Sequence, residues 1–227
     1  MTRALGLSVS KWDGLVDYQK AKQAGVSFVI AKASQWVADP RFKENQKNAK
    51  EAGLLRGFYH FLDWGLSEIK QADIFVETMG GDWGELPPCM DYEMKNFALY
   101  GLNRDQAQGK AWNFVSRVEK LTGKLPMIYA GYYSWIEMGS PAIGWARYPL
   151  WEACYSAEIF VRIPPPWKRW EFWQFTGKAD GTKYGTQSLD AELNWFNGTE
   201  AELQAFANVT PPTHPAICPT CGQEWKP

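Results

Sequence analysis

Strand-like and helix-like segments alternate through the first 133 residues, and this alternation restricts the fold more than any other feature. Apolar runs predict strands at residues 5–10, 26–32, 55–61, 86–93 and 126–133. Amphipathic stretches that end at glycines or follow capping residues predict the helices between them, at 15–24, 39–53, 67–79 and 103–123. Such a pattern is typical of parallel strands joined by right-handed helical crossovers.

After residue 133 the helices become sparse. Residues 149–155 and 169–176 predict further strands, joined by irregular loops that include Pro164–Pro166, and Thr199 caps a last short helix. We therefore predict an α/β protein with a single (β/α) barrel, TIM-barrel-like and irregular in its second half, and incomplete or flattened. The barrel domain is expected to span residues 1–208, followed by a linker and a Cys-x-x-Cys tail at 209–227. Reactive groups in such folds gather at the C-terminal ends of the strands.

Two carboxylates lie at one of these strand ends. Asp91 and Glu93 close the apolar segment that begins at Leu86. Because side chains alternate along a strand with a period of two, both acids point the same way and Tyr92 points the other way. Repulsion between neighbouring acids favours keeping a proton on one of them. One protonated and one ionised carboxyl group is the requirement for glycosidic bond cleavage.

Composition excludes several other functions. A formal net charge of −1 argues against a partner bound by bulk electrostatics, such as nucleic acid or an anionic membrane. No stretch approaches the roughly 20 apolar residues of a membrane span. The segment Met1–Leu7 lacks the features of a signal peptide, so we expect synthesis in the cytosol. The four cysteines do not suggest a disulfide scaffold, and Cys89 and Cys154 are expected to be small buried residues.

Aromatic residues leave one question open. The 13 tryptophans could pack in a large core or stack on sugar rings, and composition does not decide. Those near predicted loops or strand ends are Trp12, Trp36, Trp64, Trp83, Trp135, Trp145, Trp151 and Trp167. Of the two histidines, His60 is expected to be a core or supporting residue, and neither a serine triad nor a phosphate loop is present.

The tail raises the question of a metal. Cys218 and Cys221 resemble one half of a zinc ribbon, and His214 could be a third ligand, whereas tetrahedral zinc takes four. A metal-free tail is the preferred interpretation, and zinc shared between two chains is the alternative. The protein is accordingly expected to be a monomer or a tail-mediated dimer. No cofactor is expected for catalysis.

Several motifs, in order, resemble glycoside hydrolase family 25 lysozymes over roughly residues 4 to 207. They are Gly6–Gly14, Phe28–Ser34, Asp39–Asn45, Ala52–Leu54, Gly57–Phe61, Met90–Glu93, Ile128–Ala130, Trp173–Thr176 and Leu193–Gly198. The resemblance implies a β/α barrel muramidase that cleaves the β-1,4 bond between N-acetylmuramic acid and N-acetylglucosamine in bacterial peptidoglycan. It also suggests a phage endolysin that reaches the wall after release by a separate protein.

Residue roles follow from the same resemblance. Glu93 matches the catalytic acid, and Asp91 matches an acid that assists, in support of the substrate's own acetamido group. We expect further residues to bind substrate: Ser8, Lys32, Tyr59, Tyr129, Trp151, Tyr155, Gln174, Asp190 and Glu192.

Three positions depart from the family pattern. Ser8 stands where the family usually carries Asp, Gln35 where it usually carries Glu, and Glu192 where it usually carries Asp. The central pair is intact, which predicts an active but retuned site. Two alternatives remain at this stage: a non-catalytic peptidoglycan-binding module on the same fold, and a hydrolase of another amino-sugar polymer such as chitin.

Overall fold

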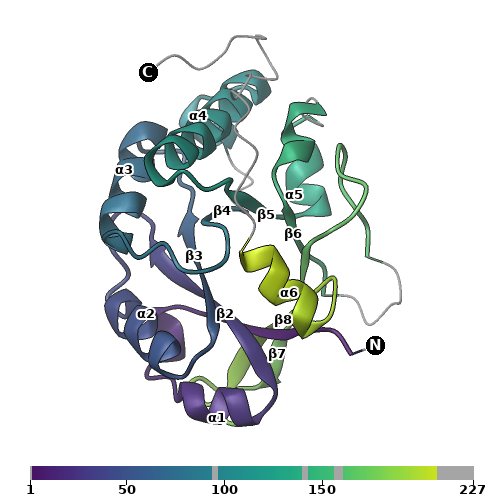
Figure 1. The fold of residues 1–227 in the computed structure, drawn as a ribbon. Coiled ribbons are helices and arrows are strands. Elements are labelled where there is room, and N and C mark those ends of the chain that lie inside the picture. Colours follow the sequence, from purple (N-terminus) through teal and green to yellow (C-terminus); the bar gives the residue numbers. More distant parts are fainter. Residues whose placement is uncertain (1, 94–96, 140–142, 156–160, 209–227) are drawn as a thin grey trace.

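A computed structural model of the chain describes residues 2–93, 97–139, 143–155 and 161–208 (Figure 1). Within these residues, eight strands follow one another in chain order around a closed barrel. The strands are β1 (Leu5–Val9), β2 (Val26–Ser34), β3 (Leu55–Phe61), β4 (Cys89–Tyr92), β5 (Met127–Gly131), β6 (Leu150–Ala153), β7 (Phe172–Asp180) and β8 (Asp190–Phe196). The predicted single barrel is confirmed, although it is closed rather than incomplete or flattened.

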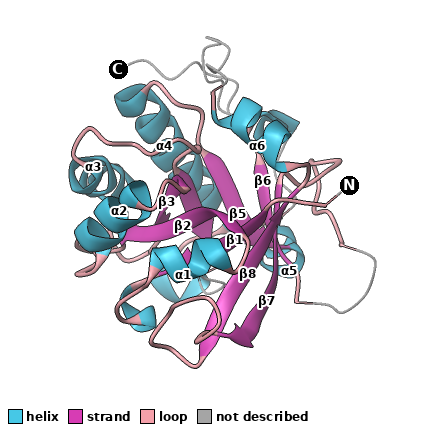
Figure 2. Ribbon diagram, turned by 60° about the horizontal axis from the view of Figure 1, so that its bottom comes forward, coloured by secondary structure: helices cyan, strands magenta, loops and turns pink. Residues whose placement is uncertain are grey.

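Helices cover the barrel mainly on the side of the first five strands, whereas β7 and β8 lie open at the front of Figure 2. They are α1 (Tyr18–Gln23), α2 (Phe42–Glu51), α3 (Glu68–Met79), α4 (Arg104–Thr122), α5 (Tyr132–Glu137) and α6 (Glu200–Ala207), with 3₁₀ turns at Lys11–Asp13, Phe97–Tyr100 and Ile143–Arg147. Local sequence explains their ends: Asn103 and Thr199 form capping boxes, and Gly80 and Gly123 end α3 and α4 in the left-handed conformation. No helix in the described ranges is long and apolar enough to cross a membrane.

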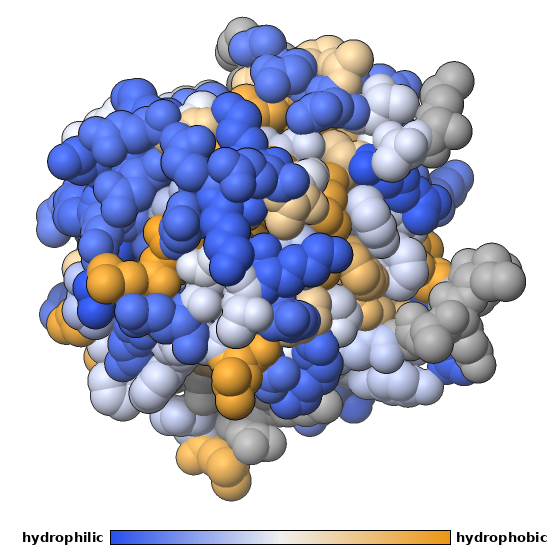
Figure 3. Space-filling model, turned by 90° about the horizontal axis from the view of Figure 1, so that it is seen from below, coloured by the Kyte–Doolittle hydropathy of each residue, from blue (hydrophilic) through white to orange (hydrophobic). Residues whose placement is uncertain are grey.

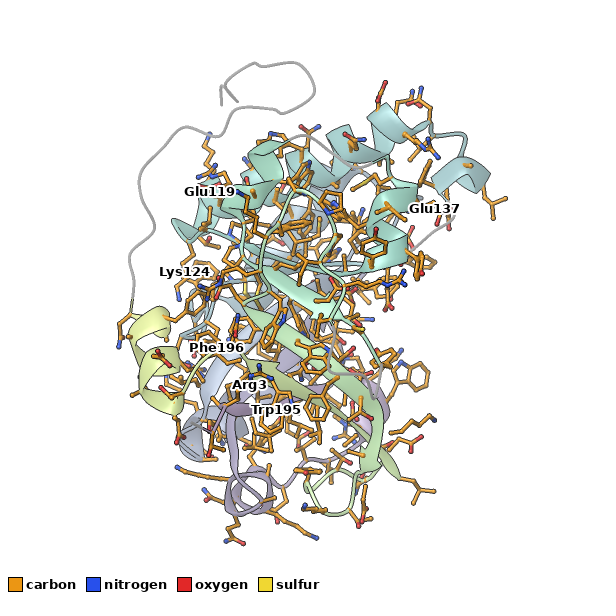
Figure 4. The ribbon with its side chains drawn as sticks, turned by 90° about the vertical axis from the view of Figure 1, so that its right-hand side faces the viewer. Arg3, Glu119, Lys124, Glu137, Trp195 and Phe196 are labelled. Carbon is orange, nitrogen blue, oxygen red and sulfur yellow. The ribbon has the colours of Figure 1, made fainter. Side chains whose placement is uncertain are left out.

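The last strand runs in the opposite direction to its neighbours. β8 pairs antiparallel with both β1 and β7, whereas the other neighbouring strands pair parallel. Figure 4 labels Trp195 and Phe196 in β8 close to Arg3, which precedes β1. Because β8 is reversed, its first residues rather than its last lie at the C-terminal end of β1, and Glu192 is paired with Ser8. The barrel mouth therefore receives an acid from the start of a strand.

Side-chain alternation divides the apolar residues into two cores. One fills the barrel with Phe28, Ile30, Cys89, Met127 and Phe172, among others, and the larger one lies between the barrel and its helices. Gly6 leaves room for the inner core, since a β-carbon there would lie 2.2 Å from the Phe28 ring. At the opposite end from the mouth, α6 adds Leu203 to the inner core, so that end is closed.

Two local predictions are wrong. Tyr132 and Tyr133 begin α5 rather than extending β5. Asp39 does not cap α2, which begins at Phe42; its carboxylate instead accepts hydrogen bonds from the backbone N–H groups of Lys11 (3.1 Å) and Arg41 (2.9 Å). Asp39 thus ties the segment after β1 to the segment after β2, which holds two edges of the barrel mouth together.

His60 is a supporting residue, as predicted. It is fully buried and hydrogen-bonds Ser34 Oγ at 2.8 Å and Gln71 Oε1 at 3.0 Å. Burial lowers the pKa of His60 to about 4, which keeps the ring neutral at physiological pH. Cys89 is buried and Cys154 is half-buried, both as free thiols. The face of the molecule below the view of Figure 1 is mostly hydrophilic, with small separate hydrophobic patches (Figure 3).

Candidate active site

Two acids lie at the C-terminal end of β4, where the alternation predicts them on one side of the strand. Asp91 is the last inward-facing residue of β4 and is 5% exposed, while Glu93 follows the strand and is exposed at the barrel mouth. Tyr92 points outward and packs edge-to-face against Trp64 and Trp135. Asp91 and Glu93 therefore meet above the inner core.

The pKa values of both acids are raised. Burial, followed by repulsion from Glu93, raises the pKa of Asp91 well above its usual value. Crowding by protein atoms raises the pKa of Glu93, although that residue as a whole is exposed. Lys32 opposes both shifts through its positive charge. Asp91 Oδ1 is buried and accepts no hydrogen bond from the described part of the chain. Each acid of the pair therefore keeps its proton to a higher pH than an isolated carboxyl group would.

A hydrogen-bonded network centred on Gln174 adds a third acid. Gln174 Oε1 accepts the hydroxyl hydrogens of Tyr129 at 2.6 Å and Tyr155 at 2.5 Å. Its Nε2 donates to Glu192 at 2.8 Å. Burial, then repulsion from Asp13 and Glu93, raises the pKa of Glu192 to about 7. Glu192 can thus change its charge near neutral pH beside the first pair.

Ser8 lies beneath this network and is 2% exposed. Its Oγ accepts from Asn194 Nδ2 at 2.8 Å and from Gln174 Nε2 at 3.5 Å. Asn194 Oδ1 in turn accepts from Trp151 Nε1 at 2.9 Å. Trp151 is almost fully buried under Tyr129, with ring centroids 4.6 Å apart. The floor of the site is therefore held by hydrogen bonds between uncharged side chains.

Two clefts flank the acids. The β1–β2 cleft, of about 270 Å³, is lined by Lys11, Trp12, Lys32 and residues 35–40. Trp12 is 78% and Trp36 is 58% exposed. The β5–β6 cleft, of about 450 Å³, is lined by Glu93, Tyr129, Glu152, Tyr155, Arg162 and the start of α5. Lys32 lines one cleft and Glu93 lines the other, and the charge of Lys32 acts on Glu93.

The structure shows which tryptophans are buried in a core and which are exposed, a question that composition left open. Only Trp12 and Trp36 of the eight near loops or strand ends are exposed, and both line the β1–β2 cleft. Trp83 is half-buried, and the remaining five belong to the apolar cores or the barrel floor. An indole face that is open in a cleft is available to a ligand, so the sugar-stacking interpretation narrows to these two residues.

The predicted substrate-binding residues are not all gathered at the acids. Tyr59 faces into the barrel near Trp151, with ring centroids 6.3 Å apart, and Lys32 Nζ donates to Gln35 Oε1 at 3.1 Å. Asp190 instead pairs with Lys178 at 2.7 Å on the exposed part of the β7–β8 hairpin. Most of the set therefore surrounds the mouth, and Asp190 lies to one side.

Sequence reasoning missed three polar residues near the acids. Asp13 accepts from Ser10 N at 2.8 Å and repels Glu192. Asn194 connects Ser8 to the barrel floor. Glu152 is fully buried on β6, where its Oε1 accepts from Tyr132 N at 3.0 Å. Asp13 could have been found because it closely follows the first strand, but Glu152 sits in an apolar run that gave no signal.

Metal binding has no support within the described ranges. No group of three or more His, Cys, Asp or Glu side chains there is arranged to hold an ion. His214, Cys218 and Cys221, the residues of the zinc hypothesis, lie outside the described residues. The chemistry that the mouth offers is acid–base chemistry by carboxyl groups: a protonated acid on one side of a cleft and further carboxyls within electrostatic reach.

Comparison with known proteins connects this geometry to a family. The profile described as "Glycosyl hydrolases family 25" matches residues 7–182. "Lysozyme M1" from Streptomyces globisporus is 33% identical over 217 residues, covering 90% of this chain and 71% of the relative. "N,O-diacetylmuramidase" from Chalaropsis sp is 30% identical over 216 residues, covering 89% of this chain and 98% of the relative.

A solved structure agrees. The fold is similar to that of a family GH25 lysozyme from Aspergillus fumigatus, with a TM-score of 0.80 and 31% sequence identity. The similarity covers 92% of this chain and 100% of that one. The profile match ends before β8, so Glu192 and Asn194 lie beyond the matched range.

Proposed function

Because the chain belongs to glycosyl hydrolase family 25, we propose that Glu93 and Asp91 carry out the cleavage reaction of this peptidoglycan hydrolase. The enzyme is a lysozyme, and its substrate is the glycan of the bacterial cell wall. The bond broken is the β-1,4 bond between N-acetylmuramic acid and N-acetylglucosamine. The observation that supports the assignment of roles is the acid pair at the end of β4, buried Asp91 and exposed Glu93, with both pKa values raised.

Glu93 acts as the general acid. Its raised pKa favours the protonated form that a general acid requires, and its position in the β5–β6 cleft exposes the carboxyl group to substrate. As the glycosidic C–O bond breaks, this proton moves to the leaving oxygen. Asp91 assists by accepting a hydrogen bond from the N–H of the substrate's acetamido group while the acetamido oxygen bonds to the anomeric carbon. Water then opens this intermediate and returns a proton to Glu93.

The other residues of the mouth and of its floor position the substrate, either directly or by holding the side chains that contact it. We assign this role to Ser8, Lys32, Tyr59, Tyr129, Trp151, Tyr155, Gln174 and Glu192, and with least support to Asp190. Tyr129, Tyr155 and Glu192 are held by Gln174, so one amide sets the orientation of three groups around the cleft. The barrel of residues 1–208 is proposed to contain the whole catalytic unit, with no cofactor.

The test compares wild type with Glu93→Gln, which keeps the side-chain shape and removes the transferable proton. General acid catalysis contributes roughly 10²–10⁴-fold. Lysis of purified cell walls should fall at least that far, while circular dichroism and the thermal midpoint stay near those of wild type. Glu51→Gln, an exposed substitution at the end of α2, is the matched control.

Product analysis tests the bond. New reducing ends should be N-acetylmuramic acid. Reducing ends of N-acetylglucosamine, or faster turnover of chitin oligosaccharides, would contradict the proposed specificity. Near-normal lysis by Glu93→Gln would place the general acid elsewhere.

A further inference from the structure

The β5–β6 cleft contains a guanidinium group, that of Arg162, which pairs with no acid in the described part of the chain. Arg162 Nη1 donates to the Tyr133 hydroxyl at 2.7 Å. Its Cζ lies 5.9 Å from the ring centroid of Tyr132 and 5.8 Å from that of Tyr133. No ion pair joins Arg162 to a carboxylate among the residues that the structure describes. These contacts hold the guanidinium in place and leave most of its N–H donors available.

Arg162 is the positively charged side chain among the described residues that line this cleft. The acids that line it are Glu93 and Glu152. Burial raises the pKa of Glu152 to about 9, so this carboxyl group is neutral at pH 7. The raised pKa of Glu93 also favours its protonated form. Arg162 is therefore the group in this cleft that attracts an anionic ligand.

The chemistry of the Arg162 guanidinium group indicates the class of ligand that this cleft would bind. A guanidinium offers paired donors that match a carboxylate, and such charge-assisted hydrogen bonds are stronger than neutral ones. At about 450 Å³ the cleft falls within the usual range for small-molecule sites. It contains the proposed acid Glu93, so a ligand in it is attached to, or next to, the scissile bond.

We propose that Arg162 binds a free carboxylate of the stem peptide carried by N-acetylmuramic acid next to the bond that is cleaved. The inference rests on the proposed function, since peptidoglycan supplies a glycan with acidic peptide branches. Recognition of the branch selects peptide-bearing wall over unsubstituted amino-sugar polymers. It also gives α5 a role, because its first two residues hold the arginine.

The experiment uses two substrates that differ in charge. One is soluble, uncrosslinked peptidoglycan with free stem carboxylates, and the other is the same material with those carboxylates converted to methylamides. The measured quantity is the ratio of kcat/KM on the acidic strands to kcat/KM on the neutral strands. It is determined for wild type, Arg162→Gln, Arg162→Lys and Arg169→Gln. Arg169 is the matched control, an exposed arginine outside this cleft that pairs with Glu171 at 2.7 Å.

Loss of a charge-assisted contact should lower the ratio about tenfold in Arg162→Gln, chiefly through KM. Arg162→Lys should be intermediate, because a point charge replaces the planar fork. Arg169→Gln should keep the wild-type ratio. An unchanged ratio in Arg162→Gln, or an equal loss on both substrates, would overturn the proposal, since the latter would mean that Arg162 only supports Tyr133.

Two further measurements distinguish a failure of this inference from a failure of the proposed function. Strands freed of stems by an amidase carry only the lactyl carboxylates of the sugar, and the same Arg162-dependent loss on them would overturn the assignment to the stem. Binding of the acidic and neutral strands to Glu93→Gln, with and without Arg162→Gln, is measured by calorimetry. A wild-type protein that binds the strands but does not cleave them would contradict the proposed function alone, and charge-dependent weakening by Arg162→Gln would still support this inference.

Discussion

Gln174 donates a hydrogen bond of 2.8 Å to the carboxylate of Glu192 and fixes that acid at the barrel mouth. The acid is in this position because β8 is antiparallel, which pairs Glu192 with Ser8 at the C-terminal end of β1. A group that titrates near pH 7 therefore lies within electrostatic reach of the proposed acid and its assistant. The pH dependence of catalysis should depend on it.

Glu192→Gln should shift the alkaline limb of the pH–rate profile to lower pH. Above pH 7 the Glu192 carboxylate is ionised and repels negative charge on Asp91 and Glu93, which raises their pKa values. Without that charge Glu93 loses its proton at lower pH. The measurement is kcat/KM against pH on purified walls, with Glu51→Gln as the charge-matched control. Superimposable limbs would show that Glu192 is not coupled to the acid.

Ser8→Asp should have the opposite effect. The new carboxylate would accept from Asn194 and Gln174 in place of the hydroxyl, and would add negative charge under the acids. The alkaline limb should then move to higher pH relative to wild type. Ser8→Asn adds a similar volume without charge and controls for crowding at this buried position. If the Asp and Asn variants share one profile, the first-strand position has no electrostatic role.

Trp36→Ala should weaken binding of long glycan strands. Stacking of an exposed indole on a sugar is expected to contribute about 1 kcal/mol, so KM should rise roughly three- to tenfold with little change in kcat. Leu121→Ala, a half-exposed apolar residue on α4, is the control. KM and kcat are compared on strands of increasing length. An effect that is independent of length would remove Trp36 from the glycan path.

Arg56→Met should destabilise the fold without changing the residues of the candidate active site. Arg56 is 2% exposed, and its guanidinium binds Asp82 at 2.8 Å and Glu85 at 2.7 Å. Removing one partner of a buried ion pair costs about 3–5 kcal/mol, and the half-exposed carboxylates favour the lower end of that range. Denaturant unfolding measures the loss, with Arg169→Gln as an exposed control. A change below about 1 kcal/mol would contradict this expectation.

The same ion pair predicts an acid sensitivity. The hydrogen bond from Arg56 lowers the pKa of Asp82 to about 2, below its value in the unfolded chain. Its stabilisation is therefore complete above about pH 4 and is lost as the pH falls towards about 2. Arg56→Met should show a smaller loss of stability across that interval than wild type.

Truncation after Asn208 should leave a folded, active barrel. α6 ends at Ala207, and its Leu203 closes the inner core, so residues beyond 208 are not required for that closure. Activity on walls and the unfolding midpoint should match those of the full chain. The molecular mass of the full chain in solution is also measured with and without a chelator, since a change in mass would reveal a zinc-dependent dimer. Loss of folding on truncation would place the domain boundary elsewhere.

Local patterns in the sequence determined much of the architecture. The alternation of strands and helices predicted the barrel, because each apolar run and each amphipathic stretch must bury its apolar face. This requirement can be seen in the segment itself and does not depend on which distant residues pack against it. The period of two predicted Asp91 and Glu93 on one side of the strand; in the structure β4 ends at Tyr92, and the two acids next to that end repel each other electrostatically. His60 as a buried supporting residue followed from the apolar strand around it.

The tertiary structure alone decided which distant residues meet. The reversal of β8, which pairs Ser8 with Glu192, depends on how the barrel closes and has no local signature. Nor does sequence reveal that Trp12 and Trp36 stay exposed while Trp135 and Trp145 are buried. The contact of Arg162 with Tyr132 and Tyr133 of α5 likewise joins residues that are distant in the sequence. Such contacts are set by long-range packing of the whole chain, whereas residue patterns record only which face of each segment is apolar.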